Sequence, residues 1–135
     1  MTHDEFQAVV DARLAKIAAQ LLSKGKEYAA KHRTTDRLAN FKHGAELERS
    51  TPMKACLGRM SKQLVSIVDY IHDDADGIAH TEVEWQEKLG DAINYLILLE
   101  GLVKESLCSS SAEKSANGSA SETESRLKSS GSAVA

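Results

Sequence analysis

Apolar residues that recur every three or four positions constrain the fold of this chain most. One such stripe lies near the N-terminus and consists of Phe6, Val10, Leu14, Ile17 and Leu21. Another lies in the middle of the chain and consists of Met53, Leu57, Met60, Leu64, Ile67 and Ile71. This spacing places side chains on one face of an α-helix, so the stripes predict amphipathic helices that pack against one another.

Local start and stop signals divide the chain into four predicted helices. The first follows Thr2 as N-cap and reaches about Lys31, and a shorter one covers residues 38–48 after a polar break. Ser50-Thr51-Pro52 begins the third, because proline suits the first helical turn, and an aspartate-rich segment at 73–77 ends it. The last helix opens at Thr81 or Glu82 and runs to about Leu107.

The composition favours an all-α bundle of about four helices followed by a flexible tail. Aromatic residues make up only 4% of the 135 residues and there is one proline, which suits helices better than a sandwich or barrel. Residues 1–107 form the predicted bundle domain. Residues 108–135 contain ten serines and carry no net charge, which predicts a disordered, low-complexity tail.

The two cysteines and the N-terminal sequence indicate the cellular compartment in which we expect the protein. Cys56 and Cys108 lack metal-ligand spacing and are expected to be free thiols in a reducing cytoplasm. The N-terminus has no signal-peptide pattern, and no apolar run approaches the ~20 residues that cross a bilayer. We therefore expect a soluble cytoplasmic protein with no membrane partner.

The formal net charge of −3 hides a segregation along the chain. Residues 24–62 hold ten Lys and Arg against four acids, a net charge of +6, whereas residues 63–105 hold two bases against ten acids, a net charge of −8. Two interpretations stay open. Oppositely charged helices attract each other within or between subunits, or the basic half receives an anion.

A polar stripe interrupts the apolar run of the last predicted helix. Glu87, Asp91 and Asn94 follow one another at i, i+4 and i+7, beside residues that are apolar enough to form the core of a helical bundle. A carboxylate and an amide in that position are costly unless they are paired. The partner is a backbone group, a basic side chain, a metal or a ligand.

The sequence lacks the motifs of several common catalytic and metal-binding sites. Asp74-x-Asp76-Gly77 lacks a ligand position before the glycine and the glutamate six residues after it, so it is no EF-hand. No serine sits in a nucleophile elbow, and the five histidines have no zinc-binding context. We expect no catalytic residue, no metal and no cofactor.

Three short segments remain: Lys24-Gly25-Lys26-Glu27-Tyr28, residues 36–42, and Asp91-Ala92-Ile93-Asn94-Tyr95. Together they resemble small phage and prophage proteins of the nucleotide-modification-associated type and, more loosely, the all-α MazG-like nucleotide pyrophosphohydrolases. The resemblance covers roughly residues 21–103 and implies a helical fold and a nucleotide ligand.

The metal-binding acids of the MazG-like enzymes are incomplete in this chain. Those enzymes hold magnesium with Glu-Glu-x-x-Glu on one helix and Glu-x-x-Asp on the next. Here Lys88 stands where the first acid of the second motif belongs, and Glu46 and Glu48 are two residues apart and do not share a helical face. The departures argue against metal-dependent hydrolysis more than against the fold.

The basic, aromatic and polar residues of these three segments favour nucleotide binding over nucleotide hydrolysis. Phosphates would pair with Lys24, Lys26, Arg37 and Lys42, and Tyr28 or Phe41 would stack on a base. Asp91 and Asn94 would read base or ribose edges. The predicted ligand-binding set is Lys24, Lys26, Tyr28, Arg37, Asn40, Lys42, Asp91 and Asn94. In the competing interpretation Asp91 pairs with Arg37 or Lys62, Asn94 satisfies a backbone group, and both aromatics belong to the core.

Together these observations predict a phage-type protein that binds a phosphate-bearing nucleotide. Its predicted role is to sequester a nucleotide, or a nucleotide immune signal, in the host cytoplasm. One alternative is a magnesium-dependent MazG-like nucleoside triphosphate pyrophosphohydrolase. Another is a helical adaptor that inhibits a host protein. Helices this apolar in so short a chain leave surface uncovered, so we expect a homo-oligomer. No nucleic-acid polymer is expected as a partner.

Overall fold

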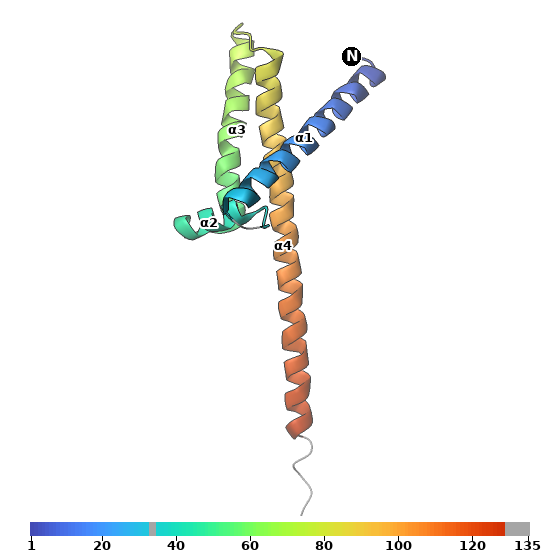
Figure 1. Cartoon of the computed structure of the whole chain (residues 1–135), viewed down its shortest axis with the longest axis vertical. Helices are drawn as coiled ribbons and strands as arrows, with labels where there is room; N and C mark the ends of the chain where they lie inside the picture. The colour runs from blue at the N-terminus through green and yellow to red at the C-terminus, as the bar shows by residue number, and fades with distance from the viewer. Residues whose placement is uncertain (33–34, 129–135) are drawn as a thin grey trace, which may run out of the picture. The chain divides into compact units, whose positions relative to one another are not determined.

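The chain folds into α-helices joined by short loops, as a computed structural model shows (Figure 1). The structure describes the backbone of residues 1–32 and 35–128 and the side chains of residues 1–23 and 35–111. Within that part there are four helices and no strand: α1 (His3–His32), α2 (Ala39–Glu48), α3 (Pro52–Ala75) and α4 (Glu82–Lys128). The predicted all-α class and the number of helices are confirmed.

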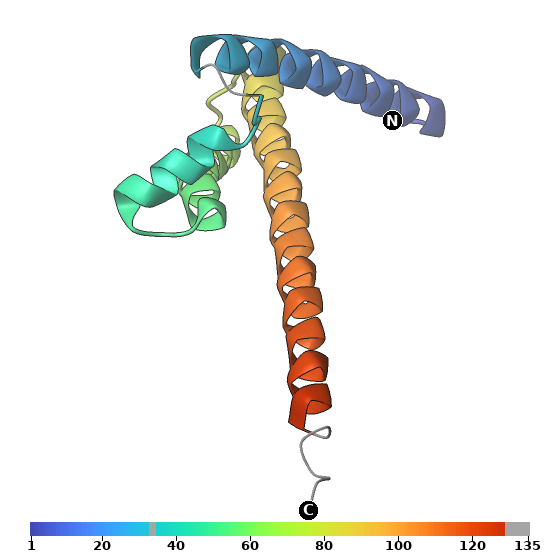
Figure 2. The ribbon, with the colours of Figure 1, turned by 60° about the horizontal axis from the view of Figure 1, so that its bottom comes forward.

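The chain divides into two compact units, Met1–Leu102 and Val103–Ala135, and the candidate site lies in the first. The core of this unit joins α2, α3 and α4. It is built from Leu38, Phe41, Cys56 and Leu102, with Met53, Tyr95, Leu98 and Leu99 packed around them. α2 folds back against the start of α3 (Figure 2). Phe41 meets Tyr95 edge-on at 6.5 Å between ring centroids, so Phe41 is a core residue.

Both cysteines are free thiols, as predicted. Cys56 is fully buried in the core, whereas Cys108 is exposed. Burial raises the pKa of the Cys56 thiol, because a thiolate there would be poorly solvated. Cys56 therefore behaves as a small apolar side chain.

Side-chain caps fix where the helices begin. Thr2 and Glu5 bond reciprocally at the start of α1: the Glu5 amide donates to Thr2 Oγ1 at 3.2 Å and the Thr2 amide to Glu5 Oε2 at 2.6 Å. Thr51 Oγ1 accepts from the Lys54 amide at 3.3 Å, with proline in the first turn of α3. Thr2 and Thr51 are thus the caps that the sequence predicts.

Thr81 and Glu84 repeat the reciprocal cap at the start of α4. The Glu84 amide donates to Thr81 Oγ1 at 3.3 Å, while the Thr81 amide and hydroxyl both donate to Glu84 Oε2, at 2.8 and 2.7 Å. The backbone bond and then the hydroxyl bond from Thr81 lower the pKa of the Glu84 carboxyl. The predicted opening of the last helix at Thr81 or Glu82 is confirmed.

Left-handed residues close two helices. Gly77, with φ of 80°, follows α3, and the Ile78 amide donates back to the Asp73 carbonyl at 2.8 Å. Arg49 takes φ of 50° after α2, where the Ser50 amide donates to the Ala45 carbonyl at 2.8 Å. Glycine adopts this conformation without strain, but arginine does not.

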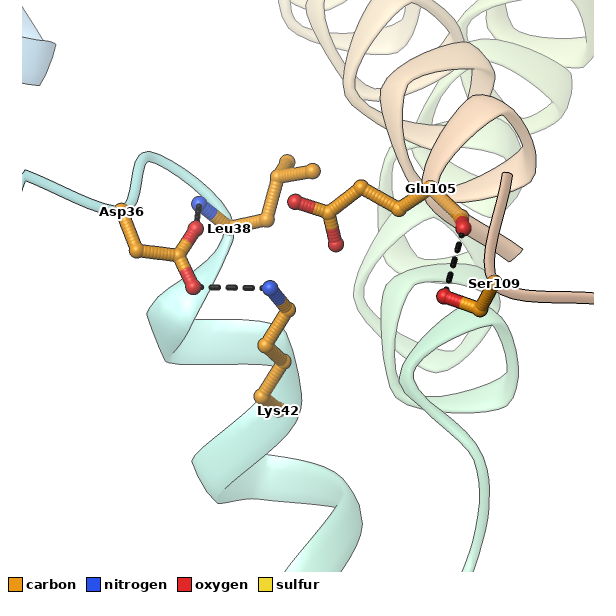
Figure 3. A network of polar contacts seen from close by, with 5 residues as sticks. All are labelled: Asp36, Leu38, Lys42, Glu105 and Ser109. Atoms are coloured by element: carbon orange, nitrogen blue, oxygen red, sulfur yellow. Dashed lines mark hydrogen bonds and ion pairs between the residues drawn. The ribbon is translucent and has the colours of Figure 1, made fainter. Parts of the chain in front are cut away.

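The backbone of α4 continues past Leu107, where the sequence predicts its end, to Lys128. The hydroxyls of Ser109, Ser110 and Ser111 donate to the carbonyls four residues earlier, at 3.0, 2.9 and 2.9 Å; Figure 3 shows the bond from Ser109 to Glu105. Most of the predicted tail falls on residues 112–135, outside the described side chains. No helix of the described part is long and apolar enough to cross a membrane.

Candidate polar site at Asn94

The side chains of Asp91 and Asn94 contact different helices in the structure. Asp91 lies half-buried toward α3, where Gln63 Nε2 donates to its Oδ2 at a long 3.4 Å. Asn94 is buried toward α1, and its Nδ2 donates to Gln20 Oε1 at 3.0 Å. Glu87, the third member of the predicted stripe, is exposed. The polar stripe therefore spreads over adjacent faces of α4 and does not form one surface.

Asn94 is buried with one polar atom unpaired. Its side chain is 6% exposed, and its Oδ1 accepts no hydrogen bond from the residues that the structure describes. Rotating the amides of Asn94 and Gln20 together would exchange donor and acceptor but would still leave one group of Asn94 unpaired. An unpaired buried acceptor costs about 1–3 kcal/mol, so Asn94 is the most unusual polar residue of the core.

Polar side chains of α1 bind α4 along the two turns that precede Asn94. Arg13 Nη1 donates to the Gln86 carbonyl at 2.9 Å, and Lys16 Nζ donates to Gln86 Oε1 at 3.0 Å. Gly90, one turn before Asn94, makes room for Arg13: a Cβ there would lie 2.8 Å from Arg13 Nη1. We call this contact the α1–α4 polar seam, formed by Arg13, Lys16, Gln20, Gln86, Gly90 and Asn94.

Sequence reasoning overlooked most of the polar seam. The predicted apolar stripe of α1 places Leu14 in the core, but Leu14 is 60% exposed. The helix instead turns Arg13 and Gln20 toward α4 on either side of Ile17, its only fully buried residue among those described. The spacing of Gln86, Gly90 and Asn94 at four-residue intervals was the available signal, because such residues share a helical face.

Arg37 reaches the same stretch of α1 from the loop before α2. Its guanidinium donates to the backbone carbonyl of Leu21, next to Gln20. The structure therefore brings Arg37 and Asn94 to consecutive residues of α1. It does not pair Asp91 with Arg37, and no ion pair of Asp91 with Lys62 is present among the described side chains. The competing interpretation, in which either residue neutralises Asp91, is wrong here.

Lys42 lies one turn into α2 and binds Asp36, as Figure 3 shows. Its Nζ lies 2.7 Å from Asp36 Oδ2, while Asp36 Oδ1 accepts from the Leu38 amide at 2.8 Å. The Lys42 hydrogen bond, followed by that of the Leu38 amide, lowers the pKa of the Asp36 carboxyl. Lys42 thus holds the start of α2, and a phosphate would have to compete with Asp36 for it.

Asn40 contributes its backbone to the local structure. Its carbonyl accepts from Arg59 Nη2 at 3.4 Å, and the same guanidinium lies 5.2 Å from the centre of the Phe41 ring. The remaining members of the predicted set, Lys24, Lys26 and Tyr28, lie on α1 outside the described side chains. Their predicted roles stay predictions.

A separate cluster stands where α3 turns into α4. His80 stacks on Tyr70 at 3.6 Å between ring centroids, and Trp85 meets Tyr70 edge-on at 5.3 Å. His80 Nε2 lies 2.7 Å from Asp73 Oδ2. The side chain of His80 is only 17% exposed, because the two aromatic rings and Asp73 enclose it.

Among the described residues, no group of three or more His, Cys, Asp or Glu side chains is placed to hold a metal ion. No protein-family model, curated protein or solved structure matches this chain. The candidate site is therefore defined by its geometry: a buried amide with one unpaired atom, a neighbouring glutamine on α1, and an arginine anchored one residue further along α1.

Proposed function

We propose that this protein binds a phosphate-bearing nucleotide where α1, the loop before α2 and α4 meet. The observation that carries the proposal is the unpaired Oδ1 of buried Asn94. A buried acceptor without a donor is an unusual defect in a folded core, and a bound ligand that supplies an N–H group removes it.

The chemistry of the amide favours adenine as the base. An asparagine side chain pairs with adenine through two hydrogen bonds, in which its oxygen accepts from N6 and its nitrogen donates to N7. Asn94 Oδ1 would gain a donor, and the adenine N7 would replace Gln20 Oε1 as the partner of Nδ2. Guanine presents only acceptors, O6 and N7, on that edge and leaves Oδ1 unpaired.

The phosphates would lie toward the basic part of the chain. Arg37 is exposed and is the guanidinium nearest in sequence to the start of α2. A guanidinium binds phosphate bidentately, which suits Arg37 better than Lys42, whose ammonium is already paired with Asp36 at 2.7 Å. Lys24 and Lys26, which the sequence predicts as phosphate partners, lie outside the described side chains and stay predictions.

Titration calorimetry against adenine and guanine mono-, di- and cyclic nucleotides tests the proposal. We expect adenine nucleotides to bind and guanine nucleotides to bind at least about tenfold more weakly. Arg37→Ala should weaken binding, whereas Arg49→Ala, which removes an exposed arginine at the other end of α2, should not. The absence of any binder, or an Arg37→Ala protein that binds like wild type, would overturn the proposal.

We propose binding without hydrolysis, because Lys88 replaces an acid of the MazG-like magnesium motif. The enzyme alternative requires pyrophosphate release from a nucleoside triphosphate that stops when a chelator is added and when Asp91 becomes asparagine. Measuring pyrophosphate with the purified protein therefore separates sequestration from hydrolysis. Release under those conditions would replace the binding proposal with the enzymatic one.

We also propose that the protein acts as a homo-oligomer. Large apolar side chains are exposed on three helices: Phe6, Val9 and Leu14 on α1, Leu57, Leu64 and Ile71 on α3, and Val83, Leu89 and Leu96 on α4. Monomeric soluble proteins rarely expose apolar surface so widely. Sedimentation at micromolar concentration should give a species larger than the monomer, and a monomer alone would refute this part. A host adaptor role would instead appear as a captured host protein with no nucleotide bound.

A further inference from the structure

Polar side chains hold α1 against α4 along the α1–α4 polar seam. Arg13 and Lys16 both bind Gln86, at 2.9 and 3.0 Å. One turn further along α1, Gln20 accepts from Asn94 Nδ2 at 3.0 Å. Water can replace each of these bonds when the two helices separate, so breaking them has a small net cost. The polar seam is therefore a contact that opens more easily than an apolar one.

Little apolar burial adds to this contact. Ile17 is the only fully buried residue among those described in α1, whereas Phe6, Val9 and Leu14 are 56%, 52% and 60% exposed. The hydrophobic core lies between α2, α3 and α4, and none of its described members belongs to α1. Regions with few buried apolar contacts separate from a fold locally, before the fold as a whole unfolds. We expect α1 to leave α4 while the core stays packed.

The contacts at the two ends of α1 determine how it moves. The reciprocal cap at its start and a bond from Gln7 Nε2 to Asp11 Oδ1 at 3.0 Å lie entirely within α1, so they persist when α1 leaves α4. Beyond the polar seam, the Arg37 guanidinium donates to the Leu21 carbonyl and ties α1 to the loop before α2. The part of α1 before Leu21 therefore moves as a helix about this anchor.

Gly90 sets how closely Arg13 approaches α4. A Cβ at position 90 would lie 2.8 Å from Arg13 Nη1, which is too close for both atoms to stay in place. The atom it meets is the far end of a long, flexible side chain. An alanine at position 90 therefore moves the guanidinium away from the Gln86 carbonyl and leaves the backbone of α4 where it is. Gly90 thus permits the bond between Arg13 and α4.

We propose that residues 3–20 of α1 form a lid over Asn94 and that Arg13 is the latch that keeps this lid closed. In the closed form Arg13 binds the Gln86 carbonyl and Gln20 covers the Asn94 amide. In the open form these bonds pass to water and the Asn94 amide faces solvent. As an entry route for a nucleotide the lid rests on the proposed function, whereas the movement of α1 itself does not.

A thiol at position 94 measures the opening of the lid without any ligand. In a Cys108→Ser background, Asn94→Cys places a buried thiol against α1, and a small thiol reagent reaches it when α1 moves. Cys56 is the internal reference, because it is fully buried in the core and reacts when that core opens. Mass spectrometry assigns each label. We expect position 94 to react at least about tenfold faster than Cys56, with little dependence on low urea concentrations, because lid opening exposes little surface.

Two variants in this background test Arg13 as the latch. Gly90→Ala and Arg13→Ala each remove the bond to the Gln86 carbonyl, so each should speed labelling of position 94 by about tenfold. Both variants together should give no further increase, because they remove the same bond. Gly58→Ala is the matched control: it also replaces a helical glycine, but a Cβ there meets nothing within 4 Å. Alanine favours the helix in both cases, so neither glycine variant acts through a weakened helix.

Each outcome has a separate meaning. Labelling of position 94 with the rate and the urea dependence of Cys56 would overturn the lid, because position 94 would then open only with the core. Fast labelling that neither Gly90→Ala nor Arg13→Ala changes would overturn Arg13 as the latch. A protein that gives the expected labelling but binds no nucleotide in calorimetry would support the lid and remove the proposed function alone.

Discussion

Replacing Asn94 with leucine should stabilise the protein, although it removes a hydrogen bond. The change eliminates the unpaired Oδ1, which costs about 1–3 kcal/mol in a buried position. It also forfeits the 3.0 Å bond to Gln20, which contributes about 0.5–1.5 kcal/mol, and it improves helix propensity slightly. The half-buried Gln20 oxygen keeps access to water. The sum is a gain of about 1 kcal/mol.

Thermal unfolding followed by circular dichroism measures this gain. In a unit of about a hundred residues, 1 kcal/mol raises Tm by roughly 4–8 °C. Gln20→Leu is the matched variant and should move Tm in the opposite direction, because it leaves both groups of the Asn94 amide unpaired. If Asn94→Leu lowers Tm, the Asn94 oxygen has a partner in the folded protein, and the argument for a ligand at this position fails.

Asp91→Asn should change the free energy of unfolding by less than about 0.5 kcal/mol, because among the described side chains Asp91 bonds only to Gln63, over a long distance, and an amide can accept that bond too; a loss of several kcal/mol in urea unfolding would show a hidden ion pair. Arg49→Gly should stabilise the protein by about 0.5–1 kcal/mol, since glycine adopts φ of 50° without strain; an unchanged urea midpoint would contradict this. The pKa of Asp36 is lowered in the folded state, so the stability it contributes is present above its ordinary value of 3.8 and is lost as the pH falls through the lower folded value. Asp36→Asn should therefore flatten the acid limb of the stability profile, and a profile that matches wild type would refute that role.

Helix starts were predictable from the sequence because caps are local. The side chains that fix them, Thr2, Thr51 and Thr81, bond to amides within three residues of themselves. Any chain with these residues in these positions gains the same bonds, whatever it packs against. The end of α4 was less predictable. Ser109 and its neighbours bond back to the preceding turn, so a serine-rich stretch carries no stop signal of its own.

The candidate site was only partly predictable because it depends on which face α1 turns toward α4. The sequence singles out Asn94 as a polar group beside the core, and its burial agrees with that. Its partner, Gln20, lies 74 residues away, and no local pattern connects the two. The choice between Leu14 and Arg13 as the inward residue depends on the space that Gly90 leaves on α4. Tertiary packing determines which of these two residues faces α4, and the spacing of apolar residues in the sequence does not reveal it.

The weak attachment of α1 has a consequence for how fast a ligand can arrive. Among the described residues, α1 buries only Ile17 fully and otherwise holds α4 through polar contacts such as those of Arg13 and Gln20. Segments with few buried apolar contacts open at lower free energy than the whole domain unfolds. Because Asn94 is buried, a ligand would reach it only after α1 moves away from α4. The observed rate of ligand binding should therefore level off at high ligand concentration, at the rate at which α1 opens.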